Sequence, residues 1–131
     1  MSDDRFLVIV PTYNEVENLP RKAPQILAQD PRIDLLVVDD ASPDGTGQLA
    51  ADMAVSNPRV HALRRPAKEG LGAAYLAGFE WGLDRNYALL FEMDADISHP
   101  PEALPQMLQA ARDYDVVIGS RYVDGLSLIH I

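Results

Sequence analysis

Two carboxylates one residue apart, Asp94 and Asp96, give the strongest sign of chemistry in this sequence. They directly follow the expected strand at residues 87–93, which contains the apolar run Leu89–Phe91, so we expect them on a loop where a strand ends. Mg²⁺ and related hard cations prefer such oxygen ligands, usually one or two carboxylates together with substrate phosphates. The pair therefore predicts a metal site. The alternative is a solvated acidic turn that caps the following helix.

A second acidic pair, Asp39 and Asp40, follows another apolar run. One of the two could accept a hydrogen bond from a nucleobase or ribose, and the other could brace the loop. Because adjacent carboxylates repel each other, a basic group or a metal ion is expected nearby. Further along the same loop, Asp44 and Thr46 are sufficiently explained by turn and helix-capping chemistry.

Residues 11–15 (PTYNE) place an aromatic ring and a carboxylate after the first apolar run. Tyr13 could stack on a planar base, and Glu15 could accept a hydrogen bond from a base edge or a ribose. The alternative is a capping turn, with Asn14 as the N-cap and Glu15 favoured by the helix dipole. Arg121 follows the last predicted strand, where it could bind a phosphate in a bidentate manner or pair with a carboxylate.

A glycine-rich segment at residues 70–75 (GLGAAY) does not match the dinucleotide-binding fingerprint. Tyr75 stands where the third glycine belongs, and the segment follows the third predicted strand instead of the first. Lys68, just before this segment, could reach a phosphate. Close helix packing is the alternative role of the glycines.

These loops need a scaffold that brings them together, and the hydrophobic pattern predicts one. Short apolar runs alternate with segments of helical period, which indicates strands buried on both faces and separated by helices. The expected strands cover residues 6–10, 35–38, 60–63, 87–93 and 115–119, and the expected helices lie within 19–27, 49–54, 70–83 and 100–111. Right-handed crossovers then give a mostly parallel α/β sheet with helices on both faces and ligands at the carboxyl ends of the strands.

Composition limits the classes of function. The chain has 131 residues, 47% of them apolar, which is enough for one domain with a sizeable core. A net charge of −9, without a cluster of basic residues, excludes a general nucleic-acid coat. The absence of cysteine excludes disulfides and thiolate nucleophiles. No apolar run approaches the roughly 20 residues of a membrane span, and the N-terminus is acidic, so we expect a cytoplasmic protein.

One domain is expected over residues 1–124. Residues 125–131 (GLSLIHI) form an apolar tail for which the pattern offers no partner element. We therefore do not assign this tail to the domain.

Taken together, the motifs resemble family 2 glycosyltransferases, and among them the dolichyl- or polyprenyl-phosphate mannose synthases. The segments are PTYNE at 11–15, VVDDASPDGT at 37–46, KEGLGAAY at 68–75, MDADISHPPE at 93–102 and GSRY at 119–122. A single DxD pair is a weak sign. The whole series in this order and at these spacings is specific, and it extends over residues 6–122.

The resemblance implies a GT-A fold, here truncated at the C-terminus, with Mg²⁺ or Mn²⁺ as cofactor. It implies transfer of mannose, with inversion, from GDP-mannose to a polyprenyl (dolichyl) phosphate. By the same resemblance, Asp94 and Asp96 would hold the metal and Arg121 would meet phosphate, so these three would be the catalytic residues. The nucleotide-sugar pocket would be lined by Pro11, Tyr13, Glu15, Val38, Asp40, Asp94, Ala95, Asp96 and Arg121.

In this family, acceptor-binding and membrane-facing elements follow the GSRY segment. We therefore expect this chain to bind the donor but to transfer sugar poorly, and to sit peripherally at the cytoplasmic face of the membrane. The attacking phosphate monoester has a second pKa of about 6 and is largely a dianion at neutral pH, so it needs no general base. That agrees with a sequence that offers no obvious Ser–His or Cys–His pair.

Several alternatives stay open from the sequence. The donor could be another nucleotide sugar such as UDP-glucose, or the chain could be a sugar-nucleotide-binding module without catalysis. A nucleotidyltransferase would want a glycine-rich basic loop after the first strand, where residues 11–15 are acidic. A receiver-type signalling domain has a similar length and acidic pair, but it needs a lysine after its last strand, and the lysines here are Lys22 and Lys68.

Overall fold

The computed structural model describes residues 5–93, 117–118, 121–122 and 128–130. Strands and helices alternate along the chain: β1 (Phe6–Thr12), α1 (Leu19–Leu27), β2 (Ile33–Asp40), α2 (Thr46–Ser56), β3 (Val60–Arg65), α3 (Leu71–Leu83) and β4 (Leu89–Glu92). Three short strands follow, namely β5 (Val117–Ile118), β6 (Arg121–Tyr122) and β7 (Leu128–His130).

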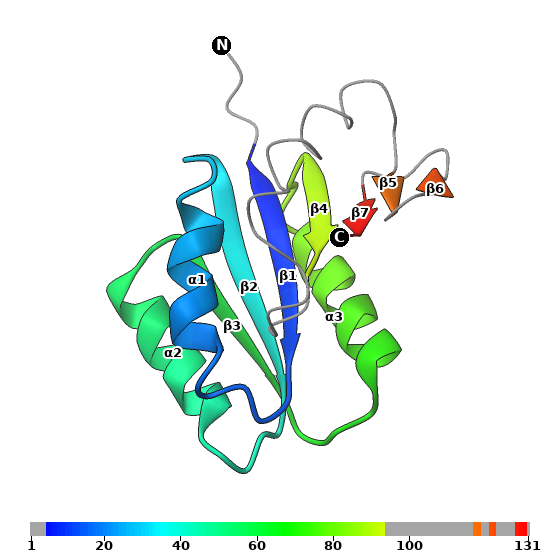
Figure 1. Cartoon of the computed structure of the whole chain (residues 1–131). Coiled ribbons are helices and arrows are strands. Elements are labelled where there is room, and N and C mark those ends of the chain that lie inside the picture. The colour runs from blue at the N-terminus through cyan, green and yellow to red at the C-terminus, as the bar shows by residue number, and fades with distance from the viewer. Residues whose placement is uncertain (1–4, 94–116, 119–120, 123–127, 131) are drawn as a thin grey trace.

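The strands form one sheet in the order β3-β2-β1-β4-β7-β5-β6 (Figure 1). All neighbouring pairs are parallel except β5 and β6, which are antiparallel. β1 lies between β2 and β4, so it is hydrogen-bonded on both sides. The predicted α/β architecture with a mostly parallel sheet is confirmed.

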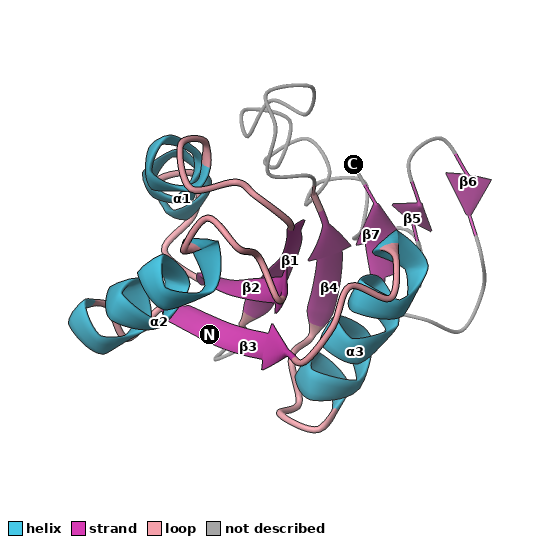
Figure 2. Cartoon of the chain, turned by 90° about the horizontal axis from the view of Figure 1, so that it is seen from below, coloured by secondary structure: helices cyan, strands magenta, loops and turns pink. Residues whose placement is uncertain are grey.

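Alternate residues of the strands divide the core into two halves, because successive side chains of a strand point to opposite faces. Val8 and Val10 pack with α1 and α2 on one face, whereas Leu7 and Ile9 pack with α3 on the other. Figure 2 shows α1 and α2 on one side of the sheet and α3 on the opposite side. Burial on both faces explains why β1 and β2 read as continuous apolar runs.

Two glycines let α3 lie close to the sheet. A Cβ atom on Gly78 would come within 2.5 Å of Ile9 Cγ2, and one on Gly82 would come within 2.7 Å of Leu90 Cδ2. Neither position has room for a larger residue. Gly78 and Gly82 therefore have a packing role, whereas a Cβ on Gly70 or Gly72, the glycines of the 70–75 segment, would meet nothing within 4 Å.

The C-terminal segment contains a strand that the apolar pattern did not predict. Leu128–His130, within the tail that we did not assign, forms β7, which pairs in parallel with β4 and β5. Residues 128–130 of the tail therefore have partner strands. The pairing is through backbone hydrogen bonds, which an apolar side-chain pattern does not reveal.

Residues 117–118 form β5 inside the expected strand 115–119. The helix expected within 100–111 lies outside the described residues, and the domain boundary after residue 124 stays a prediction.

Candidate functional site

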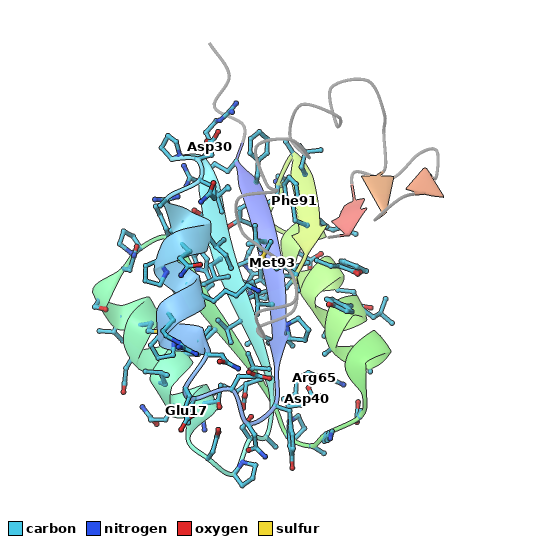
Figure 3. The ribbon with its side chains drawn as sticks, viewed as in Figure 1. Glu17, Asp30, Asp40, Arg65, Phe91 and Met93 are labelled. Atoms are coloured by element: carbon cyan, nitrogen blue, oxygen red, sulfur yellow. The ribbon has the colours of Figure 1, made fainter. Side chains whose placement is uncertain are left out.

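The carboxyl ends of β1 and β2 lie side by side. The two strands pair in parallel, and Thr12 at the end of β1 is the register partner of Asp39 near the end of β2. The loops that follow them, residues 13–18 and 41–45, therefore leave the same edge of the sheet. In Figure 3 this edge is marked by the labelled Asp40, while Asp30 marks the opposite edge. A nucleotide site built from both loops requires the first two strands to be neighbours, and they are.

Asp39 braces this edge from the face covered by α2. Its carboxylate accepts hydrogen bonds from Thr12 Oγ1 at 2.7 Å, from Ser42 Oγ at 2.6 Å and from the Ser42 backbone N–H at 3.0 Å. The residue is only 2% exposed. A Cβ on Gly47 would come within 2.8 Å of Asp39 Oδ2, so the first turn of α2 fits closely against it. Asp39 thus has the bracing role that we expected of one member of the pair.

Asp40 points to the other face and meets a cation. Arg65 Nη1 donates a 2.9 Å hydrogen bond to Asp40 Oδ1, and Figure 3 shows the two side chains close together. The Arg65 side chain is 12% exposed and that of Asp40 only 6%. The expected basic partner of the acidic pair is therefore present. Mutual repulsion within the pair is also lessened because the two carboxylates lie on opposite faces.

The second loop and the first residue of α2 hold the first loop by three hydrogen bonds. The consecutive backbone N–H groups of residues 14, 15 and 16 donate to Ser42 Oγ at 2.9 Å, Thr46 Oγ1 at 2.9 Å and Asp44 Oδ2 at 3.2 Å. We call these three acceptors, Ser42, Asp44 and Thr46, the loop clamp. Since the clamp fixes the backbone that carries Tyr13 and Glu15, it defines where those side chains can lie.

Asp44 and Thr46 therefore do more than the turn and capping chemistry assigned to them from the sequence. The Thr46 hydroxyl donates to Asp44 Oδ1, and the N–H groups of Thr46 and Val16 also donate to this carboxylate. These donors hold the pKa of the Asp44 carboxyl below its ordinary value. A carboxylate that stays ionised remains a good acceptor for the first loop.

The structure does not support Asn14 as the N-cap of α1, and it gives Glu15 a contact with Asn18. α1 begins at Leu19 with Asn18 in the N-cap position, so Asn14 does not cap the helix. Asn14 has a φ of 57°, a left-handed conformation that asparagine tolerates. The Glu15 carboxylate accepts a 2.8 Å hydrogen bond from Asn18 Nδ2, which orients it. The clamp holds residues 14–16 outside the helix, which begins at Leu19 as the apolar spacing predicts.

Tyr13 is exposed at this edge, with 37% of its surface accessible. The ammonium group of Lys68, in the segment between β3 and α3, lies 4.1 Å from the centre of its ring. A cation over an aromatic face is a favourable contact. Lys68 thus links the segment before α3 to the first loop. Its ammonium group covers one face of the Tyr13 ring.

The remaining predicted site residues fall into two groups. Pro11 and Val38 are buried in the sheet, with Val38 in the core beneath α3. Asp94, Ala95 and Asp96 lie outside the described residues, as does the side chain of Arg121, whose backbone belongs to β6. Within the described part of the chain, no group of three or more histidine or acidic side chains could hold a metal ion.

Sequence reasoning missed Ser42 and Arg65 as residues of this edge. The available signals were weak. A serine between an alanine and a proline is ordinary turn composition, and Arg64-Arg65 is a short basic pair at the end of a strand. That Arg65 stands opposite Asp40 follows only from the register of β2 and β3.

Comparison with known proteins identifies the family. The family model described as "Glycosyl transferase family 2" matches residues 7–129. This chain belongs to glycosyl transferase family 2. Membership sets aside the receiver-type alternative and confirms the predicted family.

Two curated relatives of this family 2 chain are similar over most of its length. An undecaprenyl-phosphate mannosyltransferase of Micrococcus luteus is 55% identical over 126 residues, covering 96% of this chain and 52% of the relative. A polyprenol monophosphomannose synthase of Mycolicibacterium smegmatis is 57% identical over 123 residues, covering 92% and 46%. The chain therefore spans about half the length of the curated relatives it matches.

A solved structure supports the fold of this family 2 domain. The mannosyltransferase PcManGT from Pyrobaculum calidifontis, in complex with GDP-Man and Mn²⁺, superposes with a TM-score of 0.69 at 26% identity. The match covers 92% of this chain and 37% of that one. The GT-A-type fold expected from the sequence is confirmed. None of the helices in the described part of the chain is long and apolar enough to cross a membrane.

Proposed function

We propose that this chain is the donor-binding part of a metal-dependent, inverting mannosyltransferase that moves mannose from GDP-mannose to a polyprenyl (dolichyl) phosphate. The observation that carries the proposal is the identity of 55% and 57% to relatives named as mannosyltransferases of this lipid class. The likeness to a mannosyltransferase whose structure holds GDP-Man and Mn²⁺ supports the choice of donor and metal.

The nucleotide would bind at the edge where β1 and β2 end. Tyr13, Glu15 and Asp40 come from two segments that the loop clamp and the strand register bring together. The carboxylates of Glu15 and Asp40 would accept hydrogen bonds from the base edge or the ribose, and the exposed Tyr13 ring would pack against a planar group. Pro11 and Val38 would form the floor of this pocket.

The diphosphate would be held by residues 94–96 and by Arg121. In this proposal Asp94 and Asp96 would hold Mg²⁺ or Mn²⁺, Ala95 would line the sugar-nucleotide pocket, and Arg121 would pair with a phosphate. A metal ion held there would offset the negative charge that develops on the departing GDP. An oxygen of the lipid phosphate forms a bond to the mannose anomeric carbon as the bond to GDP breaks, and the electron pair leaves with GDP. The configuration at that carbon is thereby inverted.

The acceptor is a lipid phosphate, so the proposal places the enzyme peripherally at the cytoplasmic face of a membrane. The chain spans about half the length of its relatives. We therefore expect donor binding to be retained by these residues and transfer to be weak unless further chain supplies the acceptor site.

Calorimetric titration of the chain with GDP-mannose, in Mn²⁺ and in EDTA, tests the proposal. We expect binding in Mn²⁺ that weakens at least tenfold in EDTA, and Asp96→Asn should lose this metal dependence while the fold survives. Asp84→Asn, an exposed carboxylate at the C-cap of α3, is the matched control and should bind as the wild type does. Metal-independent affinity, or equal affinity of the Asp96→Asn variant, would contradict the metal assignment.

The same titration with UDP-glucose separates the alternative donor. Tighter binding of UDP-glucose than of GDP-mannose would favour that alternative. A transfer assay with GDP-mannose and a short polyprenyl phosphate then compares this chain with a longer one that carries the C-terminal part of a relative. Equal turnover by both would show that the acceptor site is complete within these 131 residues.

A further inference from the structure

Arg65 connects two parts of the candidate pocket. It is the register partner of Asp40 in the parallel pair of β2 and β3, so the two side chains start from adjacent strand ends on the same face. Arg65 Nη1 donates to Asp40 Oδ1, and Arg65 Nη2 pairs with Glu69 in the segment that leads into α3. The guanidinium is thus held at two of its nitrogens, on one side by a buried carboxylate and on the other by an exposed one.

The contact leaves one oxygen of Asp40 available. Among the described residues, Arg65 is the partner of Asp40 Oδ1, and Oδ2 accepts no hydrogen bond. Asp40 is 4% exposed, so its carboxylate has little freedom to choose another orientation while Arg65 holds it. A nucleobase that reached Asp40 would therefore meet an acceptor whose direction is set in advance.

The same segment also reaches the first loop. Lys68, three residues after Arg65, lies over the ring of Tyr13. Arg65 and Lys68 together therefore tie the segment between β3 and α3 to the end of β2 and to the first loop. Loss of Arg65 would loosen Asp40 and this segment at once.

We propose that Arg65 is a positioning residue that sets the base selectivity of the pocket by orienting Asp40, an inference that rests on the proposed function. A carboxylate only accepts hydrogen bonds. Guanine offers two adjacent N–H donors on one edge, the ring N1–H and the exocyclic amine. An Asp40 held by Arg65 can accept one of them at Oδ2 and the other at the second lone pair of Oδ1. Uracil offers one donor between two carbonyl oxygens, and hypoxanthine lacks the exocyclic amine. An Asp40 that Arg65 no longer orients should lose most of its preference for guanine.

The test measures the affinities of GDP, inosine diphosphate and UDP in Mn²⁺ for a set of variants of the 131-residue chain. We expect the wild type to prefer GDP over inosine diphosphate by about tenfold, the value of one good hydrogen bond. Arg65→Met should weaken GDP about tenfold and reduce this preference to about twofold or less. Arg65→Lys, which keeps the charge but not the two-sided contact, should fall between them. Arg85→Met, at the opposite edge of the sheet, is the matched control and should leave all three affinities unchanged.

A double-mutant cycle separates positioning from a general structural role. If Arg65 acts through Asp40, adding Arg65→Met to Asp40→Asn should change GDP affinity less than twofold. This double variant also removes both charges of the ion pair, so it serves if Arg65→Met alone does not fold. Equal loss for all three nucleotides, or a full Arg65→Met effect in the Asp40→Asn background, would overturn the inference but leave the proposed function standing. Failure of the wild type to bind GDP at all would overturn both.

Discussion

Thr12 and Asp39 face each other across β1 and β2, and Thr12 Oγ1 donates a 2.7 Å hydrogen bond to Asp39 Oδ1. Both residues are almost completely buried, at 3% and 2% exposed. The pair stands at the point where the two loops of the candidate site leave the sheet. It therefore links the stability of the sheet edge to the geometry of the site.

Thr12→Val is expected to lower the free energy of unfolding by about 1–3 kcal/mol. The isosteric change keeps the packing volume but removes a donor from a buried carboxylate. The two hydrogen bonds from Ser42 remain and limit the loss. Urea denaturation followed by circular dichroism measures it, with Thr12→Ser as the control that keeps the hydroxyl. A Thr12→Val protein as stable as the wild type would show that this hydrogen bond contributes nothing net.

Thr46→Val is expected to weaken GDP-mannose binding by up to about tenfold. The change removes the acceptor of the Glu15 N–H and a donor to Asp44, so the first loop is no longer held in place. Of the two lost hydrogen bonds, the one from the Glu15 N–H acts directly on the first loop, and its contribution of about 0.5–1.5 kcal/mol sets the upper limit of the effect. Calorimetric titration measures the affinity. Thr46→Ser should restore it, and if the serine variant binds as weakly as the valine variant, the clamp is not what positions the loop.

Gly78→Ala is expected to destabilise the fold by about 1–3 kcal/mol, because its new methyl group would collide with Ile9 in a close-packed core. Gly72 provides a matched control in the same helix. A Cβ there meets nothing within 4 Å, so Gly72→Ala should stabilise the protein by about 0.4–1 kcal/mol. Thermal unfolding of the two variants should therefore shift in opposite directions. Shifts of the same sign would contradict the close approach of α3 to β1.

Asp34 should give the protein an acid-sensitive stability. Burial opposes the ionised form, but hydrogen bonds from Arg5 and Tyr87 and the charge of Arg5 outweigh it and hold the pKa of Asp34 below its ordinary value. A lowered pKa in the folded state means that this contribution is present above about pH 4 and is lost as the pH falls through the folded pKa.

Asp34→Asn should therefore be less stable than the wild type at pH 7, and the difference should shrink as the pH falls below about 4. Urea denaturation at a series of pH values measures this difference. Asp52→Asn, an exposed carboxylate on α2, is the control and should follow the wild-type curve. A difference between Asp34→Asn and the wild type that is independent of pH would refute the linkage.

The sequence by itself determined the order and kind of the elements through α3 and β4. Continuous apolar runs such as Leu35–Val38 indicated strands buried on both faces, and the helical period indicated the helices between them. These signals are local, so they can be read without knowledge of the fold. The end of α2 is also a local signal, because its C-cap residue Asn57 precedes a proline. The motifs at 11–15 and 37–46 likewise predicted two loops that leave the same edge of the sheet, which the parallel pairing of β1 and β2 confirms.

Only the tertiary structure determined which partners the residues at this edge contact. That adjacent strand residues point to opposite faces is a general rule, but the rule does not say that Asp39 faces Thr12 and α2 or that Asp40 faces Arg65. Those partners depend on the register of β1, β2 and β3, which is fixed by the packing of all three strands at once. The clamp that joins residues 14–16 to Ser42, Asp44 and Thr46 is equally non-local, because its partners are 28 to 31 positions apart in the chain. Contacts of that separation leave no periodic signal in the sequence, since they form only when the chain folds.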